Sequence, residues 1–169
     1  MQAIMLRRRA QKGVAAVEFA LVLIPMLLLA FGVVEYGRAL YQYNALVKTV
    51  RDGVRLLSQN NPADESYADI QAAAECLVVY GKTGCTGADR PLVPGLTVGQ
   101  VRICDRVHYA DCPGAVQSDY LNVETGLGVI NLVEVRVTGY TFNFLGLPFV
   151  LNANSVIFGD IRAVMRQVA

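Results

Sequence analysis

The sequence contains none of the short motifs that mark the common catalytic sites. It has no G-x-S-x-G, no H-E-x-x-H and no pairing of cysteine with histidine that would suggest a nucleophile. The stretch Gly81-Lys82-Thr83 resembles the end of a phosphate-binding loop, but Cys76 stands where that motif needs its first glycine. We therefore predict that the protein is not an enzyme and binds no cofactor.

Histidine is almost absent, since His108 is the only one in the chain. Asp105, Asp111 and Cys112 lie near it in sequence but form no known ligand spacing with it, so we expect His108 to be exposed at the surface. The acidic residues of this region also lack the D-x-D-x-D-G pattern of a calcium loop, which predicts a solvated acidic loop and no metal site. These acidic residues are Asp105, Asp111, Asp119 and Glu124.

Acidic residues are missing from the first 13 positions, which contain four of the 15 basic groups. From Val14 onward the balance reverses, with 11 basic groups against 14 acidic ones. A nucleic-acid partner would require a basic face, so this composition argues against nucleic-acid binding. The net positive charge of the chain comes instead from a short leader, residues 1–13.

A long apolar run follows the leader. Residues 14–34 contain one charged side chain, Glu18, in 21 positions. A helix of this length measures about 31 Å, which is enough to cross the hydrocarbon core of a bilayer. An ordinary secretory signal has a shorter apolar core and a small-residue cleavage site, which this run lacks. The basic leader predicts that the N-terminus stays in the cytoplasm while the remainder is exported.

Glu18 needs an explanation, because a carboxylate inside a membrane costs a few kcal/mol unless it finds a partner or reaches the headgroups. It lies close enough to Lys12 to remain solvated, which is the simpler alternative. If the chain is cleaved between Gly13 and Val14, however, Glu18 becomes the fifth residue of the mature helix. In an assembly of parallel helices it would meet the new terminal amine of a neighbouring subunit and set the register between them.

The helical pattern continues past the apolar run, over residues 35–58. Glu35, Tyr36, Gly37 and Arg38 mark the membrane exit, with an ion pair between Glu35 and Arg38. The sequence Asn60-Asn61-Pro62 ends the helix. An apolar seam is expected on this half to bind the exported domain, with charged residues facing away. The seam is Tyr36, Leu40, Tyr43, Val47, Val50, Val54 and Leu57, and the charged residues are Lys48, Arg51, Asp52 and Arg55.

The stretch G-V-A-A-V-E-F-A-L-V-L-I-P-M-L-L-L-A-F-G-V-V-E-Y-G-R-A-L-Y resembles the TadE-like pilins of tight-adherence (Flp) pilus systems. The resemblance covers residues 13–58. It implies cleavage after Gly13 by a prepilin peptidase, and a role as a minor pilin or pseudopilin in assembling an adhesive pilus. It also implies a location in the bacterial inner membrane and contacts with lipid, other pilin subunits and the assembly platform.

Two other functions fit the same residues. The first is a pseudopilin-like component of a secretion machine, which would share the chemistry of the helix but not its product. The second is a plain single-pass anchor that holds a periplasmic binding domain and keeps its leader.

All four cysteines lie beyond the apolar run, and an even number on the exported side of a membrane predicts two disulfides. Three pairings are open. We favour Cys76–Cys85 and Cys104–Cys112, because each closes a local loop that contains turn residues. A zinc site is disfavoured, since spacings of nine and eight residues do not match the usual C-x₂₋₄-C pairs.

Residues 62–169 are predicted to form a small exported α+β domain on the long helix. A second helix is expected over residues 65–80, capped by Asp64 and stopped by Gly81. Its buried face would consist of Ile70, Ala73, Ala74 and Leu77.

Alternating apolar residues predict antiparallel strands over residues 98–107, 129–144 and 155–164. A short helix over residues 161–168 is the alternative at the C-terminus. Residues 109–128 form a long polar loop between the first two strands, suited to contact a partner.

Overall fold

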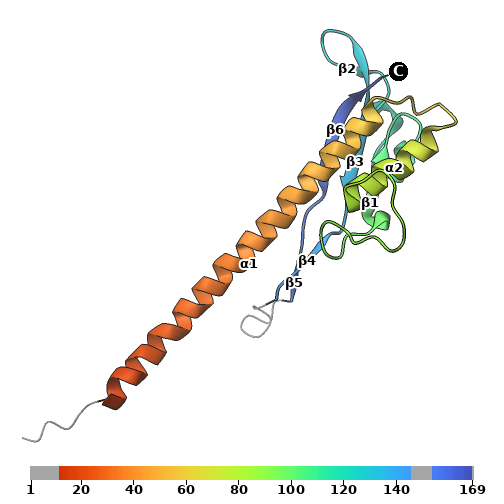
Figure 1. The fold of residues 1–169 in the computed structure, drawn as a ribbon. Helices are drawn as coiled ribbons and strands as arrows, with labels where there is room; N and C mark the ends of the chain where they lie inside the picture. Colours follow the sequence, from red (N-terminus) through yellow and green to blue (C-terminus); the bar gives the residue numbers. More distant parts are fainter. Residues whose placement is uncertain (1–11, 146–153, 169) are drawn as a thin grey trace, which may run out of the picture.

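The computed structural model describes residues 12–145 and 154–168. The predicted leader therefore lies outside the described residues, apart from its last two positions. One long helix, α1 (Lys12–Ser58), carries a small domain along its C-terminal half, and its N-terminal half projects away from that domain (Figure 1). The domain combines a second helix with antiparallel sheets, which confirms the predicted α+β fold.

Helix α1 runs for 47 residues and includes Pro25 in its interior, as its apolar and amphipathic halves predict. It ends where Asn60 binds the last turn. The Asn60 side-chain amide donates to the Leu56 carbonyl at 2.8 Å, and its backbone N–H donates to the Leu57 carbonyl at 3.1 Å. These bonds satisfy carbonyls that have no partner within the helix, which explains the confirmed end at this position.

The buried face of α1 differs from the predicted seam in its first half. Tyr36, Leu40 and Tyr43 are 66%, 43% and 44% exposed, so the prediction that they form a buried seam is wrong, although the Tyr43 ring contacts Phe158 edge-on at a centroid distance of 5.8 Å. From Val50 onward the prediction is confirmed, with Val50, Val54 and Leu57 buried. The predicted outward charges are also exposed, at Lys48, Arg51, Asp52 and Arg55.

Polar residues explain this difference. Glu35, Gln42 and Thr49 are buried on the face of α1 that meets the domain. Gln42 accepts a hydrogen bond from the Tyr140 hydroxyl at 2.9 Å, and the Thr49 hydroxyl donates to the Leu46 carbonyl at 3.1 Å. Buried polar groups are tolerated when they are hydrogen-bonded, so these residues can lie in the interface with the domain. The prediction considered only apolar side chains and therefore placed the interface on a different face of α1.

Helix α2 (Tyr67–Tyr80) begins two residues later than predicted. Ser66 occupies its N-cap position, so the prediction that Asp64 caps this helix is wrong. Asp64 instead lies in the preceding turn, where its N–H donates to the Asn61 carbonyl at 3.2 Å. At the other end Gly81 adopts a left-handed φ of 75° and donates to the Leu77 carbonyl at 3.0 Å, which confirms the predicted stop.

Helix α2 packs directly against α1. Ala74 is buried as predicted, whereas the predicted Ile70, Ala73 and Leu77 are only partly buried. Gly53 of α1 makes the contact possible, since a Cβ there would lie 2.7 Å from a methyl group of Val78. The remaining buried side chains of α2 are Tyr67, Val78 and Val79.

The main sheet is built around β3 (Val129–Val137), which pairs antiparallel with each of its neighbours. These are β1 (Val101–Cys104), β2 (Val123–Glu124) and β6 (Ile161–Gln167). Residues 133, 135 and 137 of β3 are buried valines, as the alternating pattern predicts. α1 packs against β3 and β6, so two helices cover one face of the sheet.

The strand predictions over residues 129–144 and 155–164 need correction, because each run contains parts of two strands that belong to different sheets. The run 129–144 is not one strand, because Gly139 turns the chain with a φ of 65° between β3 and β4 (Thr141–Asn143). Strand β4 pairs with β5 (Ser155–Ile157) in a separate two-stranded sheet. The C-terminal helix considered for residues 161–168 is wrong, since β6 completes the main sheet over most of that range.

Short 3₁₀ turns shape the connections. Residues 98–100, predicted as strand, form η1 (Val98–Gln100) instead. The 109–128 loop contains η2 (Tyr109–Asp111) and η3 (Gln117–Asp119) before β2. Both favoured disulfides are confirmed, Cys76–Cys85 and Cys104–Cys112. They tie α2 to the loop after it, and β1 to the segment that follows η2.

Candidate functional site

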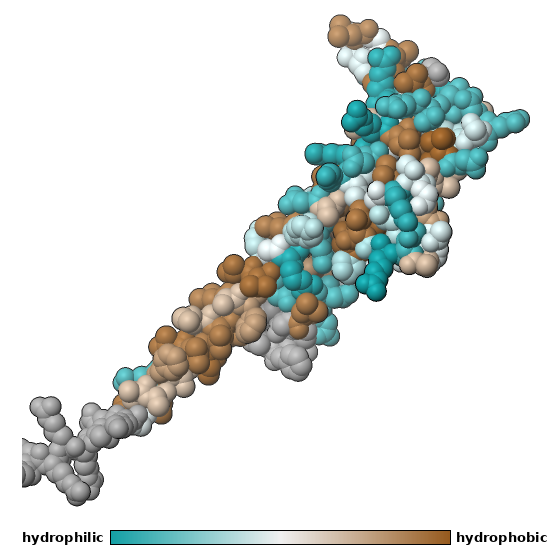
Figure 2. All heavy atoms as spheres, viewed as in Figure 1, coloured by the Kyte–Doolittle hydropathy of each residue, from teal (hydrophilic) through white to brown (hydrophobic). Residues whose placement is uncertain are grey.

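The N-terminal half of α1 presents its apolar side chains to the surroundings. No residue from Gly13 to Val34 is buried, and Figure 2 shows a continuous hydrophobic surface along this half. Within the described residues, α1 is the one helix long and apolar enough to cross a membrane. The core helix of a soluble protein would bury such residues, so their exposure supports a membrane anchor.

Gly13, Val14 and Glu18 lie together at the start of this exposed half. Val14 is 57% exposed, and a Cβ placed on Gly13 would meet nothing within 4 Å. Glu18 is also exposed, and within the described part of the chain it has no hydrogen-bond or ion-pair partner. The fold therefore gives no packing reason for the glycine at position 13 or for the carboxylate at position 18.

The membrane-exit residues divide between two sides of α1. Glu35 is 5% exposed and forms an ion pair with Arg38, while Tyr36 and Gly37 are exposed. Glu35 also accepts a hydrogen bond from the Leu145 N–H at 2.9 Å. Glu35 and Arg38 thus bind the domain, Tyr36 lines the cleft between α1 and β4–β5, and Gly37 lies in open space.

Arg38 extends the same connection. Its guanidinium donates to the Asn143 carbonyl at 3.4 Å and lies 5.0 Å from the centre of the Phe142 ring, within cation–π range. Asn143 and Phe142 belong to β4, so the ion pair clamps the β4–β5 hairpin to α1. Sequence reasoning missed these partners because Asn143 follows Arg38 by 105 positions and no periodic pattern links the two.

An apolar cleft of about 350 Å³ lies beside this clamp, between α1 and the hairpin. Three of its aromatic rings pack together, since the ring centroids of Phe142 and Phe144 lie 5.2 Å apart and those of Phe142 and Phe158 lie 6.1 Å apart. The residues that line the cleft are Gly32, Glu35, Tyr36, Ala39, Phe142, Phe144, Val156 and Phe158.

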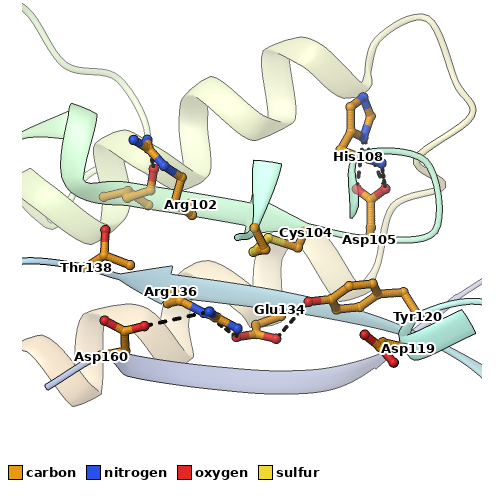
Figure 3. Close-up of a disulfide and its surroundings, with 12 residues drawn as sticks. Arg102, Cys104, Asp105, His108, Asp119, Tyr120, Glu134, Arg136, Thr138 and Asp160 are labelled. Atoms are coloured by element: carbon orange, nitrogen blue, oxygen red, sulfur yellow. Dashed lines mark hydrogen bonds and ion pairs between the residues drawn. A yellow bond between two sulfur atoms is a disulfide. The ribbon is translucent and has the colours of Figure 1, made fainter. Parts of the chain in front are cut away.

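His108 is not the plain surface residue that the sequence predicted. Its Nδ1 lies 3.1 Å from both carboxylate oxygens of Asp105 (Figure 3). Its ring also stacks on the ring of Tyr67. Asp105 is fully buried, so the prediction that it belongs to a solvated acidic loop is also wrong. The reason is local, because Asp105 accepts the N–H groups of Val107 and His108 at 2.8 Å and closes the turn after β1. Burial, followed by the charge of Asp105, raises the pKa of Tyr67.

A second group of polar residues, Tyr120, Glu134 and Arg136, attaches the 109–128 loop to strand β3 of the main sheet. The Tyr120 hydroxyl donates to Glu134 at 3.0 Å, and Arg136 donates to the same carboxylate at 2.8 Å (Figure 3). Burial, followed by the hydrogen bond to Glu134, raises the pKa of Tyr120 to about 12. Among the described residues, no three potential ligands gather to hold a metal ion. We assign both polar groups to the stability of the domain.

Comparison with known proteins leads back to α1. No curated protein and no solved structure matches the chain. Residues 13–55 match the family model described as TadE-like protein. This range begins at Gly13 and includes the apolar half of α1, the predicted membrane-exit residues and most of residues 35–58. The resemblance drawn from the sequence is confirmed over residues 13–55, the part of the chain that is similar to TadE-like proteins.

Proposed function

We propose that this protein is a minor pilin or pseudopilin that takes part in assembling a tight-adherence pilus. In this proposal a prepilin peptidase cleaves the chain after Gly13, and the subunit then assembles through α1. The observation that carries the proposal is the placement of one carboxylate, Glu18, on a fully exposed apolar helix five positions after that glycine. The start of the TadE-like match at residue 13 supports it.

Gly13 supports the cleavage step because the fold has no use for it. Glycine in a helix is less favourable than alanine by roughly 0.5–1 kcal/mol. A side chain at this position would meet nothing within 4 Å, so neither packing nor a turn requires glycine. Recognition by a peptidase that needs a small residue before the cleaved bond accounts for it.

Glu18 supports the assembly step. Cleavage creates a cationic amine at Val14, about one helical turn from the carboxylate. In a bundle of parallel mature helices, the amine of one subunit can approach Glu18 of the next within lipid, where the low dielectric strengthens the pair and makes its geometry specific. An unpaired carboxylate in the same place would be costly. The pair would therefore fix how far one subunit is displaced along its neighbour.

The exported half of α1 has a free side for such contacts. The described part of the domain covers one face of residues 35–58. It leaves Tyr36 and Leu40 exposed, and Tyr43 is exposed apart from its edge contact with Phe158. Aromatic side chains are enriched in the cores of protein interfaces. We assign this exposed stripe to contacts with other subunits, which makes α1 the element that repeats along a filament.

N-terminal sequencing of the protein isolated from membranes tests the proposal. We expect Val14 as the first residue, and we expect Gly13→Val to retain the leader. Ala20→Val adds the same side chain to an exposed position of the same helix and should be cleaved normally. An uncleaved wild-type chain that is fully functional would contradict the proposal and leave a plain membrane anchor.

A further inference from the structure

We propose that the β4–β5 hairpin rests in the outer interface of the bilayer, so that the protein touches lipid through both α1 and this hairpin. The inference depends on the proposed function in one respect, namely that α1 spans the membrane. It assigns a surface that the family match does not cover, because that match ends at residue 55.

The direction of β4 carries the first step. Tyr140, just before β4, donates to Gln42 of α1 at 2.9 Å. Leu145, just after β4, donates to Glu35 at 2.9 Å. The strand therefore descends along α1 toward its N-terminal half, by seven helical positions or about 10 Å. The hairpin thus runs toward the end of the exposed apolar segment, where a membrane-spanning helix leaves the hydrocarbon.

The composition of this region carries the second step. Between Arg136 and Asp160 the sequence has no charged residue. Leu145 and Ile157, which belong to this uncharged region, are 73% and 69% exposed. By contrast, β6 alternates exposed arginines, Arg162 and Arg166, along its outer face. A protein surface in water usually carries charged groups and avoids grouped apolar side chains. The uncharged hairpin is therefore better suited to the bilayer interface than to water.

The charged groups of α1 at this level carry the third step. Glu35 and Arg38 neutralise each other, and the hairpin supplies further hydrogen bonds to both. A charge close to hydrocarbon is expensive unless it is paired and hydrogen-bonded. Tyr36 and Tyr41 project outward beside them, 66% and 75% exposed, as tyrosines do at membrane interfaces. The apolar surface in Figure 2 likewise continues along α1 up to the domain.

Tryptophan fluorescence provides the test, because the chain has no tryptophan and an introduced one reports its own surroundings. We would reconstitute full-length chains in phosphatidylcholine–phosphatidylglycerol vesicles with or without bromine on the acyl chains, since bromine quenches by contact. Leu145→Trp reports the hairpin and Phe31→Trp reports the span. Leu127→Trp, at a fully exposed position in the turn between β2 and β3, is the aqueous control.

The expected result is loss of fluorescence in brominated vesicles for Phe31→Trp and Leu145→Trp, with Leu127→Trp unchanged. Ile157→Trp, which lies farther from the span, should be quenched less than Leu145→Trp. Quenching at Phe31→Trp without quenching at Leu145→Trp would overturn the inference and leave the membrane helix intact. No quenching at Phe31→Trp would overturn both the inference and the anchor in the proposed function.

A second copy of the chain is the competing occupant of this surface. In that case Leu145→Trp would become shielded from the aqueous quencher iodide as the protein-to-lipid ratio rises, and brominated lipid would leave its fluorescence unchanged. That result would also overturn the proposal. Because Leu145 is largely exposed, its replacement should not disturb folding, and the far-ultraviolet circular dichroism of each variant checks this.

Discussion

The backbone N–H of Leu145 donates a 2.9 Å hydrogen bond to the Glu35 carboxylate across 110 positions of sequence. Together with the bond between Tyr140 and Gln42, it fixes the β4–β5 hairpin on α1 at two levels. Polar groups thus determine how the domain sits at the membrane-proximal end of the interface, whereas buried apolar residues determine it farther along α1.

Replacing Glu35 should loosen this end of the interface. Glu35→Ala removes the acceptor of the Leu145 N–H and leaves Arg38 without its partner, which predicts a loss of about 1–3 kcal/mol in the free energy of unfolding. Chemical denaturation in detergent measures the loss. Val34→Ala, at the exposed neighbouring position outside the cleft, is the control and should change stability little. Equal stability of wild type and Glu35→Ala would contradict the role assigned to this carboxylate.

Glu18→Ala should leave the domain and the cleavage step intact but prevent assembly. The side chain is exposed and has no hydrogen-bond or ion-pair partner among the described residues, so we expect its loss to affect contacts with other chains and not the fold. We expect Val14 at the mature N-terminus and normal amounts of protein in the membrane, with no subunit in sheared pili and reduced piliation. Normal pilus assembly by this variant would remove the register function of Glu18.

Gly53 should tolerate no side chain while Val78 is present. A Cβ at position 53 would lie 2.7 Å from a Val78 methyl group, and overpacking of this kind costs about 1–3 kcal/mol. Gly53→Ala should therefore lower the denaturation midpoint, and adding Val78→Ala should recover part of the loss despite its own cavity. Gly37→Ala, in open space on the same helix, is the matched control and should stabilise slightly. Failure of Gly53→Ala to destabilise would contradict the close helix contact.

The two disulfides should be present in the exported protein. Thiol titration is expected to detect no free thiol before reduction and four afterwards, since all the cysteines are paired. Each bond closes a loop of eight or nine residues, which predicts a contribution of about 2–3 kcal/mol by the chain-entropy model. Peptide mapping that finds any other pairing would contradict the fold of this region.

Stability should fall in strongly alkaline solution because of Tyr120. Its pKa is raised to about 12 in the folded protein from an ordinary value near 10, so the unfolded chain loses its proton first as the pH rises. The contribution of Tyr120 is therefore complete below pH 10 and disappears between pH 10 and 12. Denaturation midpoints across this range should show a shallower decline for Tyr120→Phe than for wild type. An unchanged slope would show that the tyrosine titrates normally in the folded protein.

The features that sequence reasoning predicted correctly depend on local patterns. The length and end of α1, the stop at Gly81 and the alternating valines of β3 each follow from side chains a few positions apart. The disulfide pairing followed the same logic, since both bonds join neighbouring cysteines.

Most of the features it missed depend on distant partners, whereas the turn at Gly139 and the closure of the turn by Asp105 are local. Glu35 and Gln42 are buried because residues that flank β4 donate hydrogen bonds to them. The sequence of α1 alone does not indicate these partners. His108 and Asp105 likewise meet Tyr67 only after α2 folds against the main sheet. The sequence pattern places Gly139 within a strand, but its left-handed backbone conformation ends β3 and separates it from β4.

The location of the disulfides has a mechanical consequence. Both lie within the domain, and neither includes a residue of α1. In a filament joined through α1, axial tension would pass from helix to helix. The domain lies beside α1 and would therefore bear little of this force. Reducing agents would then soften the domain without lowering the force at which such a filament breaks.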